Sequence, residues 1–483
     1  MNLTSTFRRG ACVAAFFAAT LDCGAQPMPA TSAASAAPAR INTVPGMAPV
    51  TDRANLYGDA GAGKLSEAVR DALPRVYVPN LRSNDVYVID PSTFTVVDRF
   101  KVGLNPQHVV PAWDLKTLWV ANNAENTTKG SLTPVDPKTG KPGKAIAVDD
   151  PYNMYFTPDG KEAIVVAEAY KRLDFRDPVT MALKSSLATP DCKGINHADF
   201  SIDGRFAIFT CEFGGMLVKI DLVGRKVLGY LKLSTGKMPQ DIRVSPDGAT
   251  FYVADMMADG VFLVDGQSFK EIGFVKTGKG THGLYPSRDG KKLYVTNRGS
   301  NKIHGAEHGM GSVSVLDFAT RTVDVTWPIP GGGSPDMGNV SADGKWLWLS
   351  GRYDDVVYAF DTTTGAVKIV PVGKEPHGLT VWPQPGRYSL GPTANRRCGG
   401  GPRARHAGVG SARAVAQRRD GGVDAAAAEG DSLRLHCRFD AGKAAEDHRF
   451  VHVAEVADVK DAAGERAEAA GDRDLEALAR DRP

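Results

Sequence analysis

The chain has 483 residues, of which 42% are hydrophobic and 23% are charged, a composition that is ordinary for a globular protein of one large domain or several small ones. The formal net charge is only +3. A balance so close to neutral gives no bulk electrostatic basis for binding nucleic acid or an acidic membrane surface, so we expect neither as a partner.

The first 25 residues have the pattern of a secretory signal peptide. Arg8-Arg9 precedes an apolar run, Gly10 to Leu21, which is shorter than the roughly 20 residues that span a bilayer. Cys23-Gly24-Ala25 then offers a small-residue cleavage site. We therefore expect a periplasmic or secreted protein with no transmembrane segment after signal removal. A lipoprotein anchored through Cys23 is the alternative, and Asp22 fits that processing signal poorly.

Residues 26–74 are expected to form a linker ahead of the first strand. The part up to residue 50 is rich in Ala, Pro, Ser and Thr, a composition typical of flexible segments. Gly63 to Leu73 is predicted to form a short helix at the end of this linker.

A repeated strand then begins, and each copy ends in a related tetrapeptide. The copies start 42, 46, 43, 44, 42 and 54 residues apart. The seven tetrapeptides are Tyr77-Val78-Pro79-Asn80, Trp119-Val120-Ala121-Asn122, Val165-Val166-Ala167-Glu168, Ile208-Phe209-Thr210-Cys211, Tyr252-Val253-Ala254-Asp255, Tyr294-Val295-Thr296-Asn297 and Trp348-Leu349-Ser350-Gly351.

Two further patterns keep the same phase. An apolar strand that ends in aspartate recurs once per repeat, and an aspartate at this place can accept backbone N–H groups in the following turn. Asp-Gly hairpin turns precede five of the tetrapeptides. The aspartates are Asp90, Asp136, Asp177, Asp221, Asp265, Asp317 and Asp361, and the turns begin at Asp159, Asp203, Asp247, Asp289 and Asp343.

A period near 44 residues with about four short strands is typical of a propeller blade. Seven copies predict an all-β, seven-bladed β-propeller over residues 75–390. The first tetrapeptide strand has no inner strand before it, and Gly378 to Trp382 supplies one at the far end. We expect this C-terminal inner strand to complete the first blade and close the ring.

The seven tetrapeptides resemble the YVTN family of bacterial β-propeller proteins over roughly residues 75–390, and Tyr294-Val295-Thr296-Asn297 reads YVTN itself. The resemblance implies an exported or surface-associated propeller and supplies no catalytic residues. The blades are also similar to the dioxo-haem propeller of periplasmic nitrite reductases, in which channel histidines bind the haem iron. That similarity implies the same role for His108, His197, His282 and His377.

The amino-acid composition changes after the closing strand. Residues 391–483 are rich in Arg, Ala, Gly and Asp, and the repeat pattern stops. We interpret this segment as a disordered tail or as sequence read in a shifted frame, and we assign no function to its histidines and cysteines.

Export would place the protein in an oxidising compartment, where the body keeps only Cys192 and Cys211. The two cysteines lie nineteen residues apart across one predicted hairpin, and a disulfide and a pair of buried thiols both fit this spacing. There is no CxxC or CxxCH motif, which disfavours a zinc ribbon and covalently attached haem c.

Propeller ligands bind at the axial channel, near the start of the inner strands. Aligning the loops that lead into these strands places one candidate ligand-binding residue per blade at the axis. The candidates are His108, Asn153, His197, Asp241, His282, Asp336 or Met337, and His377. Such a ring can bind a metal, a haem-like cofactor or an anion, because imidazole is a common metal ligand and titrates near neutrality. Purely structural histidines that bond loop carbonyls are the alternative.

A second candidate metal site lies in the longest interval of the repeat. Its extra residues, 301–311, contain His304, His308 and Met310, and nitrogen plus thioether ligands suit copper. An ordinary insertion loop is the alternative, because Gly305 and Gly309 oppose the helix that H-x-x-x-H spacing would require.

No catalytic motif accompanies these candidates, so we expect a binding module that docks a periplasmic protein or a small ligand at its rim. A cofactor- or metal-carrying propeller related to oxidoreductases, with copper or haem bound by channel histidines, is one alternative. A lactonase-like hydrolase that uses Glu168, Glu212 or Glu307 is another, although no spacing singles these glutamates out. The sequence leaves open whether the protein is an enzyme.

Overall fold

The computed structural model describes residues 41–235, 237–304 and 307–391. The chain divides into two compact units after Asn42, and the second unit holds the propeller. The expected signal peptide, the linker up to residue 40 and the tail from residue 392 lie outside the described residues. In the described part, no helix has the length and apolar character that crossing a membrane requires.

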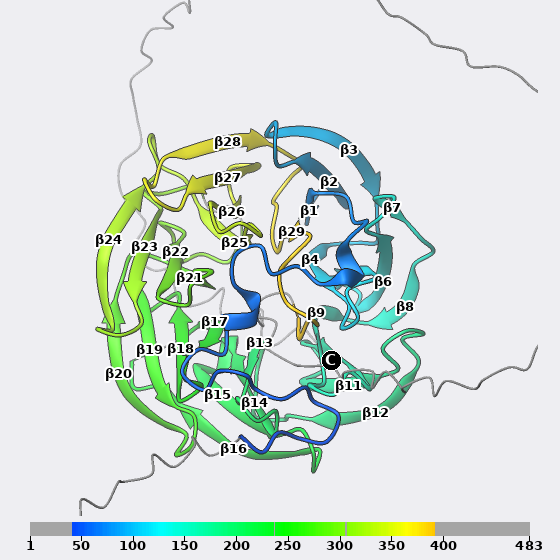
Figure 1. The fold of residues 1–483 in the computed structure, drawn as a ribbon, viewed down its shortest axis with the longest axis vertical. Coiled ribbons are helices and arrows are strands. Elements are labelled where there is room, and N and C mark those ends of the chain that lie inside the picture. Colours follow the sequence, from blue (N-terminus) through cyan, green and yellow to red (C-terminus); the bar gives the residue numbers. More distant parts are fainter. Residues whose placement is uncertain (1–40, 236, 305–306, 392–483) are drawn as a thin grey trace, which may run out of the picture. The chain divides into compact units, whose positions relative to one another are not determined.

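The described residues of the second unit form seven antiparallel sheets arranged in a ring (Figure 1), which confirms the predicted seven-bladed propeller. Blade 1 contains β29 (Thr380–Trp382), β1 (Arg75–Asn80), β2 (Asp85–Asp90) and β3 (Thr95–Lys101). Blade 2 contains β4 (Pro106–Pro111), β5 (Leu118–Asn122), β6 (Lys129–Asp136), β7 (Lys141–Pro142) and β8 (Ile146–Asp149). Blade 3 contains β9 (Pro151–Phe156), β10 (Ala163–Ala167), β11 (Arg172–Arg176) and β12 (Leu183–Ala188).

The remaining blades follow in chain order. Blade 4 contains β13 (Ile195–Phe200), β14 (Phe206–Cys211), β15 (Met216–Asp221) and β16 (Lys226–Lys232). Blade 5 contains β17 (Pro239–Val244), β18 (Thr250–Asp255), β19 (Gly260–Asp265) and β20 (Lys270–Lys276). Blade 6 contains β21 (Thr281–Pro286), β22 (Lys292–Asn297), β23 (Ser312–Asp317) and β24 (Thr322–Pro328). Blade 7 contains β25 (Pro335–Val340), β26 (Trp346–Gly351), β27 (Val356–Asp361) and β28 (Val367–Pro371).

The ring closes as the sequence predicts. β29 pairs with β1, with Trp382 opposite Arg75 and Thr380 opposite Tyr77. The chain continues beyond this strand and packs on the propeller. Tyr388 stacks on Trp113 with ring centroids 5.3 Å apart. The closing contacts therefore extend past β29.

The hydrophobic core lies between neighbouring blades. Each of the seven apolar clusters in the described residues takes side chains from two adjacent blades, such as Val109 of blade 2 and Tyr77 of blade 1. Since a blade buries an apolar face only against its neighbours, the closed ring is what gives every blade a partner on both sides.

The turn chemistry follows the predicted patterns. Gly160 and the other glycines of the Asp-Gly turns have φ between 71° and 81°, a left-handed conformation that glycine adopts without steric cost. Asp317 Oδ1 accepts the backbone N–H groups of Ala319 and Thr320 at 2.9 and 2.8 Å. The aspartate at the end of the third strand therefore terminates it by binding the turn that follows.

The segment from Thr43 to Pro74 packs across the face that carries the Asp-Gly turns (Figure 1). Leu56 N–H donates to Pro246 O at 2.8 Å, and Leu56 and Tyr57 are buried. The short 3₁₀ helices η1 (Gly58–Ala60) and η2 (Glu67–Val69) lie in this segment, and η2 falls where the sequence predicts a helix. This part of the expected linker is thus in contact with the propeller body.

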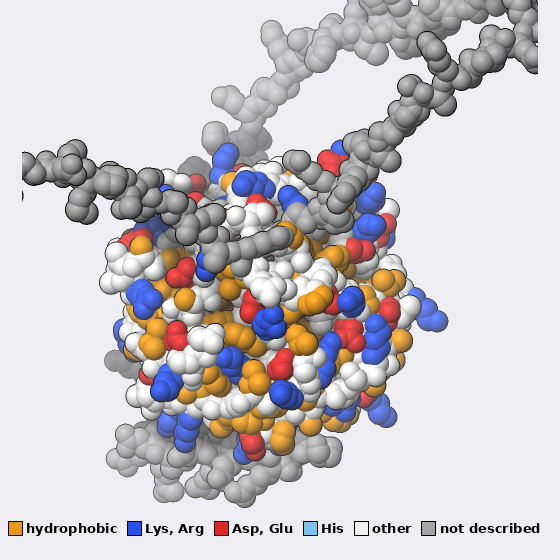
Figure 2. Space-filling model, turned by 60° about the horizontal axis from the view of Figure 1, so that its bottom comes forward, with side chains coloured by type: hydrophobic (Ala, Val, Ile, Leu, Met, Phe, Trp, Pro, Cys, Tyr) orange, Lys and Arg blue, Asp and Glu red, His pale blue; other side chains and the backbone are white. Residues whose placement is uncertain are grey.

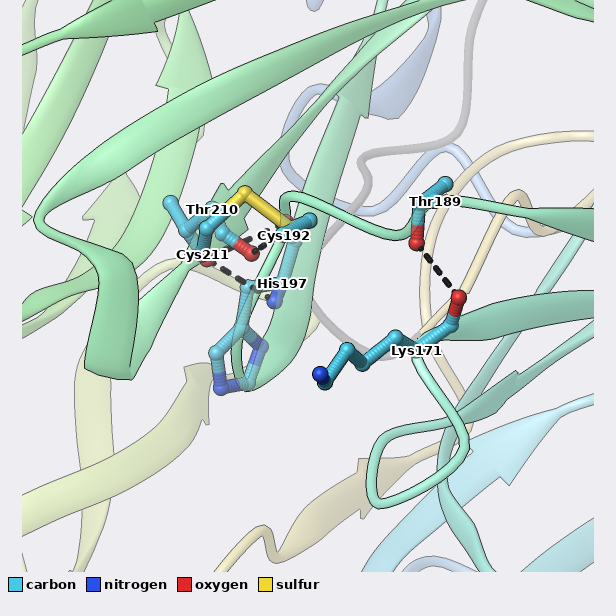
Figure 3. The surroundings of a disulfide bond; sticks show 6 residues. All are labelled: Lys171, Thr189, Cys192, His197, Thr210 and Cys211. Carbon is cyan, nitrogen blue, oxygen red and sulfur yellow. Dashed lines mark hydrogen bonds between the residues drawn. A yellow bond between two sulfur atoms is a disulfide. The ribbon is translucent and has the colours of Figure 1, made fainter. Parts of the chain in front are cut away.

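Cys192 and Cys211 form a disulfide, the first of the two states that the sequence left open. The bond spans the loop before β13 and the end of β14, close to the 3₁₀ helix η3 (Glu212–Gly214). Figure 3 shows that the backbone N–H of His197 donates to Thr210 Oγ1, at 3.0 Å, on the same hairpin. The imidazole of His197 points away from the sulfur atoms (Figure 3). The disulfide therefore fixes the hairpin that carries one of the channel histidines.

Candidate functional site

Every inner strand begins with a β-bulge or close to one, and the bulge sets which side chains reach the axis. The pairing register shifts between Pro335 and Gly338 in blade 7, for example, and between Thr281 and Leu284 in blade 6. Thr296 Oγ1, from the tetrapeptide strand, accepts the N–H of Gly283 at 2.6 Å. The hydroxyl in the third position of the tetrapeptide thus satisfies a backbone group that the bulge leaves without a ladder partner.

In six blades the second residue of the inner strand lies buried near the axis. In blade 1, whose inner strand begins at Thr380, His377 has the equivalent place, next to the bridge between Asn80 and Pro376. We call these seven side chains the inner ring. They are polar or aromatic, and none is more than 8% exposed. The inner ring consists of Gln107, Tyr152, Asn196, Gln240, His282, Asp336 and His377.

A second ring is formed by the residue that directly follows the second strand of each blade, and its members are also buried. In blade 3 this strand ends at Ala167, so the member is Glu168, which the sequence analysis counted as the last residue of the tetrapeptide. Six of these residues donate their backbone N–H to the carbonyl of the residue before the inner strand of the same blade, as Arg298 does to Gly280 at 3.0 Å. The repeat itself therefore places this ring. It consists of Leu81, Asn123, Glu168, Glu212, Met256, Arg298 and Arg352.

The two rings are joined on blades 6 and 7 by a buried guanidinium. Arg298 Nε and Nη2 donate to the two carboxylate oxygens of Asp336 at 2.9 and 3.0 Å, and Nη2 also lies 2.8 Å from His282 Nε2. His282 Nδ1 lies 2.7 Å from Asp336 Oδ1, outside hydrogen-bond geometry, and His377 Nε2 lies 3.5 Å from Oδ2. Asp336 is thus the centre of a buried cluster with two histidines and an arginine.

A different arrangement joins the rings on blades 4 and 5. Glu212 accepts the Asn196 amide at 2.6 Å and the Gln240 amide at 2.9 Å. Both partners are neutral, and burial raises the pKa of Glu212. One side of the channel therefore holds a carboxylate bound only by amides, and the other side holds arginines.

Four of the predicted channel residues, His108, Asn153, His197 and Asp241, occupy the third position of the inner strands instead. His108 stacks edge-on against His377 and His197, with centroids 4.8 and 5.2 Å apart. Asn153 Nδ2 lies 3.2 Å from His197 Nδ1. Asp241 pairs with Arg243 at 2.9 Å in the interface with blade 6. The structure therefore brings His108, His197, His282 and His377 into one cluster and places Asp241 apart from it.

Burial keeps these histidines neutral. It lowers the pKa of His108 to about 3 and that of His282 to about 4, and it holds the pKa values of His197 and His377 well below the usual range. Burial alone would raise the pKa of Asp336, but the charge of Arg298 and the nearby histidines hold it well below its usual range. At neutral pH the cluster therefore contains a charged Arg298–Asp336 pair among uncharged imidazoles.

Arg352 lies at the mouth of the channel, 3% exposed. Its Nη2 is 3.2 Å from Glu375 Oε1, while Nε and Nη1 make no hydrogen bond. Besides burial, the charge of Arg352 lowers the pKa values of His108, His282 and His377, so it lies close enough to act on the histidine cluster. The sequence analysis named neither Arg298 nor Arg352 as a candidate, because scattered basic residues are usually solvent-exposed. Their position directly after each tetrapeptide was the signal for the second ring.

His282, Asp336 and His377 form the one group of metal-type ligands found among the described residues, with donor atoms within 4.8 Å of one another. A metal about 2.1 Å from each nitrogen needs donor separations of roughly 3 Å, so these side chains would have to move closer. Arg298 would also have to leave, because it occupies both carboxylate oxygens. Two imidazoles and a carboxylate are suitable ligand types for a divalent transition metal, but the Arg298–Asp336 ion pair competes with metal binding.

A haem does not fit between the channel histidines. His108, His197 and His377 pack ring against ring, and the Gly378 Cα lies so close that an added Cβ would be 1.9 Å from His108 Nδ1. The rings leave no slot for a macrocycle.

The two histidines among the candidate copper ligands of the insertion loop have acidic partners. His304 Nδ1 lies 3.1 Å from Glu375 Oε1, and His308 Nδ1 lies 3.0 Å from Asp354 Oδ1. Met310 is 78% exposed. His304 therefore helps to connect blade 6 with the Glu375 loop at the channel mouth, next to Arg352, at 3.3 Å.

Solved structures with the same fold include a proposed 6-phosphogluconolactonase from Bacteroides uniformis, at 17% identity and a TM-score of 0.51, covering 64% of this chain and 99% of that one. A protein of unknown function from Desulfotomaculum acetoxidans matches at 14% identity and a TM-score of 0.51, covering 64% and 98%. The dihydro-haem d1 dehydrogenase NirN matches at 15% identity and a TM-score of 0.49, covering 66% and 78%.

Comparison with curated protein sequences finds no match. The family model of YNCE-like β-propellers, in contrast, matches residues 36–385, the N-terminal segment and all seven blades. With this match over most of its length, the chain belongs to the family of YNCE-like β-propellers.

Proposed function

We propose that this protein is an exported binding module that takes a small polar molecule into the channel lined by the inner and second rings. One observation carries the proposal: several buried polar atoms of the inner strands and second ring have no hydrogen-bond partner within the described part of the chain. They include Arg352 Nε and Nη1, both ring nitrogens of His108 and His377 Nδ1. A buried polar group without a partner costs roughly 1–3 kcal/mol, so a concentration of such groups favours a ligand that bonds them.

A ligand in the channel accounts for these atoms better than a protein docked on the rim, because they lie inside the ring. The outer surface gives less indication of a binding site. On the face in Figure 2, basic, acidic and apolar side chains are interspersed. This mixture supports the expectation that nucleic acid is not the partner.

Two features support export. The first 25 residues have the order of a signal peptide, and the Cys192–Cys211 disulfide is of the kind that persists in oxidising compartments. We therefore expect the protein in the periplasm or outside the cell.

A metal-carrying propeller is the second candidate, and the His282, Asp336 and His377 group is the observation that favours it. A lactonase-like hydrolase has less support. Glu212 is bound by two amides, and the likeness to the proposed lactonase shows only the fold.

The test is to export the full chain to the periplasm, purify it without chelators or a histidine tag, and analyse what it carries. Elemental analysis, visible absorbance and mass spectrometry of molecules released on denaturation cover both candidates. We expect a near-stoichiometric small molecule that is lost in Arg352→Met and kept in Arg205→Met, a surface control. Stoichiometric metal that disappears in His377→Ala would support the second candidate. A protein that carries nothing and binds none of a broad panel of small molecules would contradict both.

A further inference from the structure

We infer that the channel selects an amphoteric ligand, a small molecule that carries both an amine and a carboxylate. The inference rests on the proposed function, because it names the class of molecule that the channel would bind. It follows from how hydrogen-bond donors and acceptors are divided between opposite sides of the ring.

Blade 7 supplies the donors. Arg352 is 3% exposed and uses only Nη2 for Glu375, so Nε and Nη1 can donate to a ligand. Arg298, on blade 6, is already held by both oxygens of Asp336. Arg352 is therefore the guanidinium available for a carboxylate, the anion that arginine binds best among small organic groups.

Blade 4 supplies the matching negative group. Glu212 is 6% exposed and is bound by the amides of Asn196 and Gln240. In the described part of the chain no cationic side chain forms an ion pair with it. The charges of Arg298 and His304 act on Glu212 without a hydrogen bond, so an incoming ammonium would be its first directly bonded counter-ion.

Acceptors without a partner among the described residues lie on blades 2 and 4. Because a carboxylate only accepts hydrogen bonds, the amide nitrogen of Asn196 must face Glu212, and that of Gln107 must face Glu125, 3.1 Å away. The amide oxygens of both residues are therefore left as acceptors, and they have no partner. Asn123 Oδ1, in the second ring of blade 2, has none either.

Blades 2 and 4 thus present acceptors, and blade 7 presents donors. A simple carboxylate would pair with Arg352 and leave Glu212 without a direct counter-ion, whereas a simple amine would pair with Glu212 and leave Nε and Nη1 of Arg352 without an acceptor. An ammonium has three donors for the acceptor side, and a carboxylate on the same chain reaches the arginine. Only a ligand with both groups matches both sides.

The test uses the full-length protein and a series of linear ω-amino acids from glycine to 6-aminohexanoate, with butyrate and butylamine as probes of a single charge. Affinity is measured by calorimetry and by the shift in melting temperature. We expect at least one amino acid to bind ten-fold or more tightly than either single-charge probe, and the best chain length to report the distance across the channel.

Two variants assign the ends of the ligand. Arg352→Gln should weaken binding of the best amino acid and of butyrate at least ten-fold and leave butylamine unchanged, whereas Glu212→Gln should weaken the amino acid and butylamine and leave butyrate unchanged. Arg205→Met is the control that changes neither. The comparison of amino acids with single-charge probes uses the wild-type protein, so it can refute the inference even if one of the variants fails to fold.

Equal affinity for an amino acid and its single-charge analogues, or no binding by any amino acid, would overturn the inference. If the purified protein then still carried another small molecule, the proposed function would stand without the inference, whereas a metal would support the second candidate instead. If it carried and bound nothing, both would fall.

Discussion

Replacing Asp336 by asparagine tests whether the buried cluster on blades 6 and 7 is an ion pair on which the ring depends. Asp336 is fully buried and accepts two hydrogen bonds from Arg298, which is 3% exposed. The variant leaves Arg298 charged and buried without its counter-ion. Breaking a buried ion pair in this way costs about 3–5 kcal/mol, mostly because the remaining charge is uncompensated.

The expected change in melting temperature follows from the size of the propeller. An unfolding entropy of about 2.1 cal/mol/K per residue gives roughly 0.7 kcal/mol/K for residues 43–391. Asp336→Asn should therefore melt about 4–7 °C below the wild type in a calorimetric or circular dichroism scan at pH 7. Removing the charge as well, in Asp336→Asn with Arg298→Met, should restore part of the loss, because the uncompensated charge is then gone.

Glu67→Gln is the control, because Glu67 and its partner Arg70 form an exposed pair and the melting temperature should not change. A melting temperature for Asp336→Asn within 1 °C of the wild type, or a double variant less stable than either single one, would refute the reasoning. In that case the carboxylate would not compensate Arg298 to any measurable extent.

Three further predictions concern the same scaffold. The wild type should lose stability as the pH falls from about 6.5 to about 4, because His282 is protonated in the unfolded chain below about 6.5 but in the folded protein only below its pKa of about 4. His282→Gln should reduce this loss by up to about 3 kcal/mol, measured by denaturant titrations at pH 7 and pH 4.5. An unchanged slope would contradict the neutral, buried state. Replacing Cys192 and Cys211 by serine should lower the free energy of unfolding by about 3 kcal/mol, the value for a loop of about 20 residues, and a loss under 1 kcal/mol would show that the hairpin holds without the bond. Gly378→Ala should destabilise the ring closure and displace His108, because the new Cβ would lie 1.9 Å from its Nδ1; a melting temperature equal to that of the wild type would show that the contact can relax.

The architecture could be predicted from the sequence because each blade repeats the same local signals. The Asp-Gly turns, the aspartates that end the third strands and the tetrapeptides keep one phase through seven copies, and each acts within a few residues of its own position. The closing strand followed from counting: a first blade without an inner strand needs one from Thr380–Trp382. Signals of this kind do not depend on distant contacts, so one sequence is enough to find them.

The site was predicted only in part because its geometry depends on the bulges. Aligning one polar residue per blade mixed two positions of the inner strand: His282 and Asp336 lie at the second, and His108 and Asp241 at the third. Position alone does not decide the partner, because His108 packs against His377 whereas Asp241 binds Arg243.

The second ring was missed for a related reason. Arg298, Arg352 and Glu212 are charged, and charged residues after a strand are usually solvent-exposed. Their burial comes from the backbone bond to the preceding loop and from the closed ring around them. Neither the backbone bond nor the closed ring can be inferred from the residue types alone. Comparing the residues at this position across the blades would still have identified the ring.

The most direct test of the account is a crystal structure of the full-length protein soaked at saturation with the ω-amino acid that binds best. The account predicts difference density for one molecule in the channel, with its carboxylate on Arg352 and its amine on Glu212. Density for the probe on the outer surface only, or a channel in which Arg352 bonds nothing but water, would contradict it.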